Sequence, residues 1–339
     1  MLRLLKKITI TFFFTLFLSL ISPLIYADVN FAERPDVQLF IDQMVKKHGF
    51  KKQQLVTLFS AVKIRPQVMR HINKPLEKEP WHTYQMLFVS EWRIEHGVEF
   101  WNKYQTALRE AERIYGVPAS IIVATIGIET KYGQKIGEYR VIDSLSNIAF
   151  SNTKRANFFR QELVQFLLLT RDEGLDPLKV MGSYAGAIGQ PQFMPSSYRN
   201  YAVNFSRSGK TDLMNNEIDV IGSIANYYQK HGWIQNAPVA VQALIIGDRY
   251  NYLLRKDQIN EPLTISELTK YGVVPKHKID QDDLKVKVIE LQNHYEKEYW
   301  LGFRNFDVIK RYNSSDLYAM AVYQLSSYIT SLRNRLNNG

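Results

Sequence analysis

The stretch that decides the fold runs from Pro118 to Glu129 and reads Pro-Ala-Ser-Ile-Ile-Val-Ala-Thr-Ile-Gly-Ile-Glu. Proline suits the start of a helix, and the residues from Ile121 to Ile128 would be apolar on nearly every side of that helix. A helix that is apolar all round is buried. The sequence therefore predicts a central helix enclosed by other elements, with the carboxyl group of Glu129 at its C-terminal end.

Helical patterns extend outward from this segment in both directions. Apolar residues recur at helical spacing from Val98 to Tyr115, and Gly116 closes that run. Asp36 can cap a first helix that ends before Gly49. Further helices are expected over residues 157–171 and 219–231, and from Ser314 or Ser315 onward.

The pattern of apolar and charged residues changes from helical to strand-like after about Glu261. Residues 284–288 alternate between apolar and charged side chains, and residues 299–309 are rich in aromatics. Both patterns favour antiparallel strands. The expected fold class is therefore mainly α, of the α+β type. It has a helical domain of residues 28–260 and 311–339, with a small antiparallel β domain, residues 261–310, inserted near the C-terminus.

Residues 1–27 are interpreted as an export signal. Arg3, Lys6 and Lys7 carry positive charge, residues 8–27 carry none, and Ala27 ends the segment, which is the pattern of a signal peptide. The uncharged stretch is also long enough to span a bilayer, so retention as a signal anchor, with membrane attachment, is the alternative to cleavage. Both interpretations place the rest of the chain outside the cytoplasm.

Composition excludes several classes of protein. The chain has 339 residues, of which 45% are hydrophobic and 22% charged, as in a globular protein of about two domains. It has no cysteine, which excludes disulfides, iron–sulfur clusters, thiol nucleophiles and a lipid-bearing cysteine. Its 7 histidines form no His-x-x-x-His pair, and no Gly-x-Ser-x-Gly motif occurs, which argues against zinc and serine hydrolases. The net charge of +10 favours a polyanionic partner, and because the chain is exported, nucleic acid is not expected.

Glu129 is the residue most indicative of chemistry. Burial and the negative end of the helix dipole both disfavour its carboxylate, so we expect a raised pKa, which suits a general acid near neutral pH. The alternative is an ordinary carboxylate with its head in water. Two-carboxylate glycosidase chemistry needs a second acid. Asp143 and Asp219 are candidates, and nothing in the sequence singles one out.

The glycine-rich segment 182–198 is the second indication of a site. Its small residues allow a ligand to approach the backbone closely. Gln192 offers an amide, and Phe193 and Tyr198 offer flat rings, which suit the hydroxyl groups, N-acetyl groups and faces of sugars. The alternative is a tightly packed loop between helices.

Several short motifs occur together in this chain. They are Ile-Glu-Thr-Lys-Tyr-Gly at 128–133, Arg-Val-Ile-Asp-Ser-Leu at 140–145, Ala-Gly-Ala-Ile-Gly at 185–189, Gln-Phe-Met-Pro-Ser-Ser-Tyr at 192–198, Asn-Tyr at 226–227, His-Gly-Trp at 231–233, Arg-Tyr-Asn at 311–313 and Tyr-Ala-Met-Ala-Val at 318–322. In this order, from about Phe31 to the C-terminus, the chain resembles the family of membrane-bound lytic murein transglycosylase B. The glutamate motif and the Gln-Phe-Met-Pro-Ser-Ser-Tyr string together are highly specific.

The resemblance implies a lysozyme-like α domain with an inserted β domain and a groove for glycan strands. It implies non-hydrolytic cleavage of the MurNAc–GlcNAc β-1,4 bond of peptidoglycan, which leaves a 1,6-anhydro-MurNAc end, with Glu129 as general acid and then base. Lys154 and Arg155 match a basic pair near the peptide side of the substrate. The full set of residues that match substrate-binding positions is Tyr84, Lys154, Arg155, Ser183, Gln192, Tyr227, Asn313 and Tyr318.

Two departures from the family matter. Some members bind calcium in a loop after the Ser-Ser-Tyr string, but here that loop carries Asn204, Ser206, Ser208 and Lys210 with one nearby acid. Calcium sites need oxygen ligands and are tightened by negative charge, so neither calcium nor another cofactor is expected. The second departure is the missing lipid-bearing cysteine, so the protein is not expected to be a lipoprotein.

The expected location is the periplasm of a Gram-negative bacterium, either free or held at the inner membrane by the signal. The expected partners are peptidoglycan glycan strands, with proteins of cell-wall synthesis as further candidates. Two other functions stay open. One is a hydrolytic muramidase, in which water attacks C1, and the other is a non-catalytic wall-binding scaffold that kept the groove.

Overall fold

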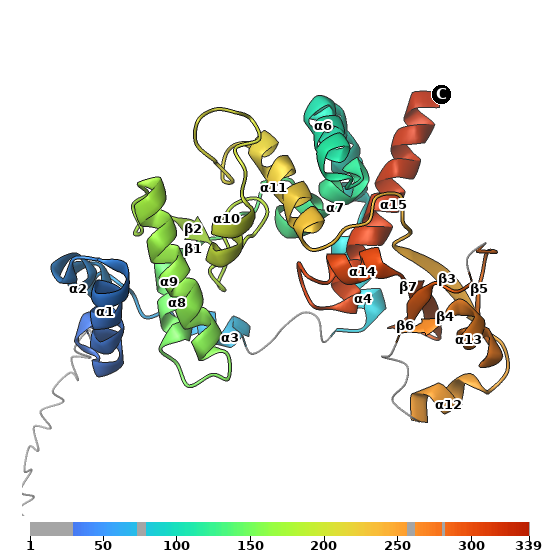
Figure 1. Ribbon diagram of the computed structural model, residues 1–339, viewed down its shortest axis with the longest axis horizontal. Coiled ribbons are helices and arrows are strands. Elements are labelled where there is room, and N and C mark those ends of the chain that lie inside the picture. Colours follow the sequence, from blue (N-terminus) through green and yellow to red (C-terminus); the bar gives the residue numbers. More distant parts are fainter. Residues whose placement is uncertain (1–29, 73–78, 256–261, 280–281, 339) are drawn as a thin grey trace, which may run out of the picture.

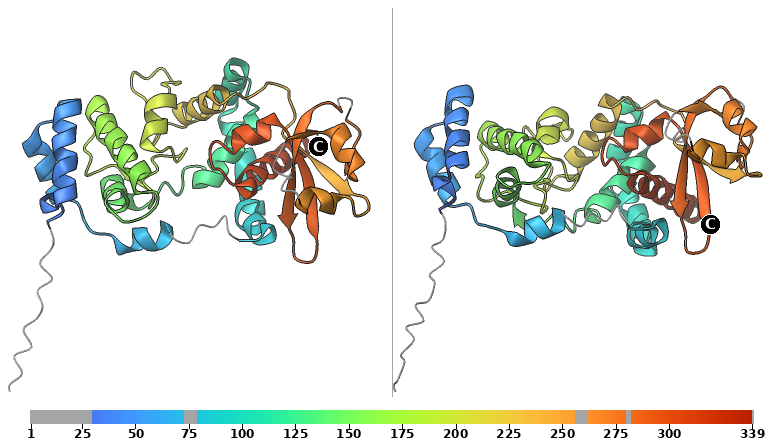
Figure 2. Two further views of the ribbon diagram at one scale, coloured as in Figure 1. Left: turned by 60° about the horizontal axis from the view of Figure 1, so that its bottom comes forward. Right: turned by 90° about the horizontal axis from the view of Figure 1, so that it is seen from below.

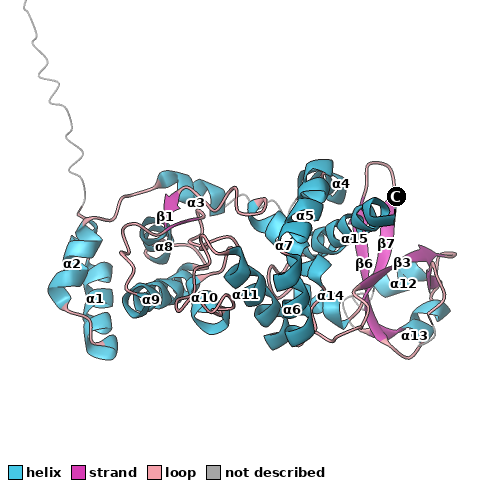
Figure 3. Ribbon diagram, turned by 90° about the horizontal axis from the view of Figure 1, so that it is seen from above, coloured by secondary structure: helices cyan, strands magenta, loops and turns pink. Residues whose placement is uncertain are grey.

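The computed structural model describes residues 30–72, 79–255, 262–279 and 282–338. The expected export signal, residues 1–27, lies outside these residues. The described chain is elongated, with α1 (Pro35–His48) and α2 (Lys52–Ser60) at one end and a small β-sheet at the other (Figure 1). Most of the remaining helices form the body between them (Figure 3).

The described elements confirm a mainly α protein with a small antiparallel sheet in its C-terminal part. The other helices are η1 (Phe31–Glu33, a 3-10 helix), α3 (Pro66–Ile72), α4 (Trp81–Phe88), α5 (Glu91–Lys103), α6 (Gln105–Tyr115), α7 (Ala119–Thr130), α8 (Val141–Ala149), α9 (Ala156–Glu173), α10 (Pro195–Tyr201), α11 (Glu217–Lys230), α12 (Tyr250–Arg255), α13 (Ile265–Lys270), α14 (Arg304–Ile309) and α15 (Asp316–Asn338). The strands are β1 (Tyr139–Arg140), β2 (Met181–Gly182), β3 (Ala240–Ile245), β4 (Leu263–Thr264), β5 (Val273–Pro275), β6 (Lys285–Gln292) and β7 (Lys297–Gly302).

Helix α7 lies at the centre of the body, as its apolar sequence predicts. Every residue from Ile121 to Ile128 is buried. The helix packs against α5, α6, α11 and α15 (Figure 1). Because α15 comes from the end of the chain, it brings residues 189 positions apart in the sequence into contact at the C-terminal end of α7.

Two helix expectations need correction. The N-cap of α1 is Arg34, followed by Pro35, so Asp36 lies in the first turn, where its carboxylate accepts a hydrogen bond from the backbone N–H of Val37 at 3.0 Å. The helical run expected from residue 98 to 115 is interrupted at Tyr104, which separates α5 from α6 with a ψ of 25°. The apolar spacing continues through this break, so the sequence pattern does not reveal it.

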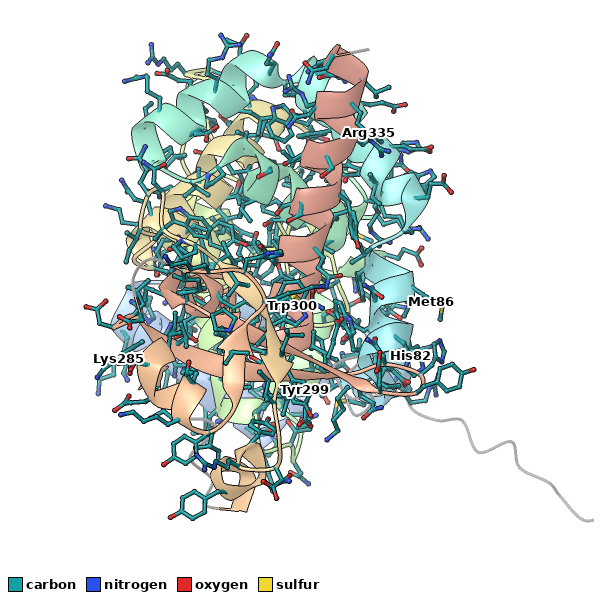
Figure 4. The ribbon with its side chains drawn as sticks, turned by 90° about the vertical axis from the view of Figure 1, so that its right-hand side faces the viewer. His82, Met86, Lys285, Tyr299, Trp300 and Arg335 are labelled. Carbon is teal, nitrogen blue, oxygen red and sulfur yellow. The ribbon has the colours of Figure 1, made fainter. Side chains whose placement is uncertain are left out.

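The sheet has the strand order β4-β6-β7-β3-β5, and all neighbouring strands are antiparallel. Alternate residues face opposite sides. In β7, the Trp300 ring packs against Tyr323 of α15 at 6.1 Å, whereas Tyr299 packs on Tyr250 of α12 at 5.3 Å on the other side (Figure 4). The sheet is thus a layer between the helical body and the small helices α12 and α13, beside α15 in both views of Figure 2.

The boundaries of the β unit differ from the expected range of 261–310. Strand β3 precedes residue 261 and occupies an interior position of the sheet. At the other end, the aromatic run forms a strand only to Gly302, after which α14 returns to the body, where the Asn305 amide donates to the carbonyl oxygens of Ile234 and Ala237 at 2.8 and 3.0 Å. We therefore propose that the β unit comprises residues 240–303.

Among the helices in the described part of the chain, none by itself has the length and apolar character needed to cross a membrane; α6 and α7 together meet that test, but they meet at a bend of 114°.

Candidate active site

The C-terminal end of α7 presents Glu129 in a half-buried position. The next residue, Thr130, donates from its hydroxyl to the carbonyl oxygen of Gln190 at 2.9 Å, which ties the helix end to the glycine-rich segment. Lys131 and Tyr132 then take left-handed φ values of 51° and 58°, which are uncommon for side chains of this size. The sharp turn directs the Lys131 ammonium onto the ring of Trp92, 5.4 Å from its centroid.

Tyr318 is the residue of α15 that meets Glu129. Its hydroxyl donates to Glu129 Oε1 at 2.6 Å. Ser315 sets the start of this helix by accepting from the backbone N–H groups of Leu317 and Tyr318 at 3.2 and 3.4 Å. Burial, with the Glu129 charge, raises the pKa of Tyr318 well above its ordinary value, so the phenol keeps its hydrogen and acts as a donor to the carboxylate.

Three more tyrosines close around this pair. The ring of Tyr312 stacks on Tyr318 at 6.2 Å and 14°, and its hydroxyl donates to the carbonyl oxygen of Pro191 at 2.6 Å. Burial raises the pKa of Tyr312, Tyr227 and Tyr228, and the negative charge of Glu129 adds to each of these shifts. The carboxylate therefore lies in a low-dielectric aromatic environment that favours hydroxyl donors.

A groove of about 900 Å³ opens beside this cluster. Its walls come from the start of α9, from the glycine-rich segment and from the loop before α15. Three of the residues predicted from the sequence, Arg155, Tyr227 and Asn313, line it. The Tyr227 hydroxyl donates to the carbonyl oxygen of Arg311 at 2.5 Å and so holds the loop at residues 310–315 against α11.

The other predicted groove residues take different places. Ser183 is half-buried, and its hydroxyl oxygen accepts from the backbone N–H of Ala187 at 3.1 Å. The Gln192 amide nitrogen donates to the carbonyl oxygens of Gly189 and Ile136 at 2.9 and 3.0 Å. Both side chains therefore shape the glycine-rich segment.

Lys154 and Tyr84 are not among the residues that line the groove. Lys154 is exposed directly before Arg155, whose guanidinium lies over the rings of Phe158 and Phe159. Tyr84 is buried in α4, with its ring centroid 4.5 Å from that of Phe88. Neither side chain lines the groove.

The glycine-rich segment is packed as closely as its composition suggests. A Cβ on Gly182 would lie 2.2 Å from the carbonyl oxygen of Ala187, and a Cβ on Gly186, which has a φ of 81°, would lie 2.5 Å from Leu145. Glycine at these two positions lets β2 and α8 approach each other. The packed loop that the sequence analysis left open thus describes the interior of this segment, whereas Tyr184, Ala185 and Met194 line the groove.

The two carboxylates considered as second acids are bound within the fold. Asp143 is fully buried and accepts from Arg140 at 2.7 and 2.9 Å and from the backbone N–H of Lys63 at 3.0 Å. Asp219 is also fully buried and accepts from the backbone N–H groups of Ser206 and Asp212 at 2.7 and 3.0 Å. Neither carboxylate faces the groove.

Glu162 is a groove residue that the sequence analysis missed. It is 4% exposed, and its two oxygens accept from the backbone N–H and the hydroxyl of Ser196 at 2.9 and 2.6 Å. The sequence offered one indication of this role, because Glu162 is an acid on the otherwise apolar face of the helix expected at 157–171. Tyr312 and Tyr228 were also missed as site residues, although Tyr312 lies within the Arg-Tyr-Asn motif and Tyr228 directly follows the Asn-Tyr motif.

Taken together, the fold and the site define a lysozyme-like class of enzyme, with one carboxyl group at the end of a buried helix, in contact with tyrosines that adjoin a groove of about 900 Å³. A family model described as Transglycosylase SLT domain matches residues 32–327. The chain is 39% identical over 320 residues to membrane-bound lytic murein transglycosylase B of Escherichia coli K12, covering 90% of this chain and 85% of that protein. This chain therefore belongs to the lytic transglycosylases of the Transglycosylase SLT domain family.

Solved structures agree with this assignment. Soluble lytic transglycosylase SltB1 from Pseudomonas aeruginosa superimposes with a TM-score of 0.81 at 42% identity, covering 88% of this chain and 100% of that one. The Escherichia coli lytic transglycosylase Slt35, solved in complex with calcium, superimposes with a TM-score of 0.80 at 39% identity, covering 90% and 95%.

The loop that the sequence analysis compared with calcium-binding loops holds several oxygen atoms close together. Asn204 Oδ1 accepts from the backbone N–H of Ser208 at 3.0 Å, and the Ser208 hydroxyl donates to the carbonyl oxygen of Lys210 at 3.1 Å. The Ser206 hydroxyl lies 3.0 Å from that of Ser208. In the described parts of the chain, no group of three or more His, Cys, Asp or Glu residues could hold a metal ion. The oxygens of the loop are thus engaged with each other, and the absence of a cofactor stays a prediction.

Proposed function

We propose that this chain cleaves the MurNAc–GlcNAc β-1,4 bond of peptidoglycan without water and leaves 1,6-anhydro-MurNAc ends. The observation that carries the proposal is the pairing of Glu129 with Tyr318 beside the groove, in a fold shared with lytic transglycosylases. The one carboxylate among the described residues that line the groove, Glu162, is bound by Ser196. In this proposal Glu129 alone therefore serves both steps of the reaction.

In the first step, the Glu129 carboxyl group gives its proton to the glycosidic oxygen. The bond from that oxygen to C1 of MurNAc breaks, and the electron pair leaves with GlcNAc. The N-acetyl group of the substrate stabilises the cationic centre at C1. In the second step, the Glu129 carboxylate takes the proton of the C6 hydroxyl as O6 bonds to C1. The proton returns to Glu129, so the cycle is balanced without water.

The side chains of the groove have distinct roles in this proposal. Tyr227 and Asn313 offer a ring and an amide to the sugars, and Arg155 offers a cation to carboxylates of the stem peptides. Ser183 and Gln192 keep the glycine-rich segment in shape, so that its backbone can approach the acetamide group. Lys154 adds charge beside Arg155, and Tyr84 supports the groove from α4.

We further propose that the enzyme works in the periplasm of a Gram-negative bacterium, free or held at the membrane by residues 1–27. The proposal rests on the signal pattern of those residues and on the membrane-bound relative. Glycan strands are the partner, and cell-wall synthesis proteins are further candidates.

Digestion of purified sacculi by the wild-type chain and by Glu129→Gln tests the reaction. The variant keeps the shape of the side chain but has no acidic proton, so a loss of about 10²–10⁴-fold in rate is expected, with retained sacculus binding. Mass spectrometry of the released muropeptides separates the alternatives, because anhydro ends are one water lighter than reducing ends. Reducing ends would indicate a hydrolytic muramidase, and binding without release would indicate a scaffold.

A further inference from the structure

The wall of the groove contains a buried carboxylate that holds a more accessible hydroxyl group. Glu162 of α9 lines the groove, yet it is only 4% exposed. Its Oε2 accepts from the backbone N–H of Ser196 at 2.9 Å, and its Oε1 accepts from the Ser196 hydroxyl at 2.6 Å. Ser196 lines the groove as well and is half-buried in α10. The carboxylate therefore lies behind a serine that a ligand in the groove can reach.

The carboxylate fixes the direction of the Ser196 hydroxyl. An ionised carboxylate only accepts hydrogen bonds, whereas a hydroxyl has one hydrogen and two lone pairs. Ser196 gives its single hydrogen to Glu162, and its backbone N–H is used on the same carboxylate. The serine oxygen is then left with lone pairs to offer the groove. A group of the substrate that binds this oxygen must therefore be a hydrogen-bond donor.

The charges of the groove narrow the kind of donor. Arg155, Lys310 and Arg311 line the same groove, and Lys310 pairs with Asp316 at 2.5 Å. The Glu162 carboxylate is already bound by two donors of Ser196. An ammonium group would therefore be repelled by the arginine side chains, because like charges repel over several ångströms. A neutral donor, such as an amide N–H, avoids this repulsion.

We propose that Glu162 is a positioning residue that holds Ser196 as an acceptor for an amide N–H of the glycan strand. The inference deepens the proposed function and rests on it, because peptidoglycan carries neutral amides in two places. One is the N-acetyl group of each sugar, and the other is the amide that joins the stem peptide to MurNAc. A hydroxyl whose hydrogen is held by a buried carboxylate suits either amide and disfavours groups that can only accept.

The test is the binding of soluble glycan strands in the Glu129→Gln background, so that the strands are not consumed. Ser196→Ala removes the acceptor and should weaken binding about 3–10-fold, as expected for one neutral hydrogen bond. In Glu162→Gln, the oxygen of the new amide must stay on the backbone N–H of Ser196, so its NH2 group faces the serine hydroxyl.

That hydroxyl then accepts from the new amide and releases its hydrogen into the groove, where it opposes an N–H donor. Binding by Glu162→Gln should therefore weaken by at least about twofold. A purely structural role makes the opposite prediction. The amide keeps both hydrogen bonds to Ser196, so a carboxylate that only supported the fold could be replaced with no change in Kd.

A double-mutant cycle shows whether the two residues act through one contact. In the Ser196→Ala protein, the further change Glu162→Gln should leave the Kd as it is, because no acceptor is left to reorient. Ser197 lines the groove beside Ser196 and provides the matched control. The effects of Ser197→Ala and Glu162→Gln on the Kd should add.

Strands from which an amidase has removed the stem peptides identify the donor. A Ser196→Ala effect that persists on these strands assigns the N-acetyl N–H, and one that disappears assigns the peptide amide. The proposal would be overturned if either Ser196→Ala or Glu162→Gln bound intact strands as tightly as its parent, or if their effects simply added. Binding is measured without cleavage, whereas the proposed function is read from the chemical ends of the products, so each can fail alone.

Discussion

Replacing Asp143 by asparagine should destabilise the protein without removing its chemistry. The carboxylate is fully buried, receives two hydrogen bonds from Arg140, and is approached by Arg65 at 3.3 Å. Removing one partner of a buried ion pair costs about 3–5 kcal/mol. Arg140 is 20% exposed and Arg65 37% exposed, and asparagine keeps one oxygen for Lys63. We therefore expect the lower end of that range, about 3 kcal/mol.

Urea unfolding followed by circular dichroism measures this loss in the free energy of unfolding. The midpoint urea concentration should fall, while the dependence of the free energy on urea concentration stays the same. Asp36→Asn is the matched control, because Asp36 pairs with Arg34 at 2.8 Å in a partly exposed position. Such surface pairs contribute about 0–1 kcal/mol. The glycan cleavage rate of folded Asp143→Asn, measured well below its unfolding transition, should stay within about threefold of wild type, a change of less than 1 kcal/mol in the barrier.

Two results would refute this reasoning. A loss of stability no larger than that of Asp36→Asn would mean that the buried ion pair does not support the fold. A stable Asp143→Asn protein that binds sacculi but no longer cleaves them would make Asp143 a second catalytic acid, against the position that the structure gives it.

Three further outcomes are expected. Adding 1 mM calcium (about the concentration that weak extracellular sites need) should leave the unfolding temperature unchanged, because the oxygens around Asn204 are engaged with each other; a rise that chelation reverses would contradict this. Gly222→Ala should cost about 1–3 kcal/mol in urea unfolding, since its Cβ would lie 2.4 Å from Phe205; no loss would mean that the contact yields freely. Tyr227→Phe should cost about 1 kcal/mol and weaken sacculus binding by freeing the loop at Arg311; unchanged stability and binding would remove Tyr227 from the groove wall.

Structural features that depend only on residues close together along the chain could be predicted from the sequence. The burial of α7 follows from its apolar run, and the helix ends at Gly49 and Gly116 follow from the left-handed φ values of 69° and 70° that glycine accepts easily. The sequence likewise indicated Glu129, because an acid directly after an apolar helix is unusual. These signals are local, since helix formation and capping involve residues a few positions apart.

Other features were decided only by tertiary contacts. The strand β3 lies outside the predicted β range because its partners, β7 and β5, lie far along the chain. The break at Tyr104 leaves no mark on the apolar spacing. The same holds for Glu162, which is recognised as part of the groove only when Ser196 is seen to bind it.

The sequence by itself therefore determined which helix is central and which carboxyl group ends it. The tertiary structure decided which groups surround that carboxyl group, because Tyr318, Tyr228 and Thr125 come from three helices that meet only when the chain is folded. Contacts between helices that lie far apart along the chain leave no periodic pattern in the sequence.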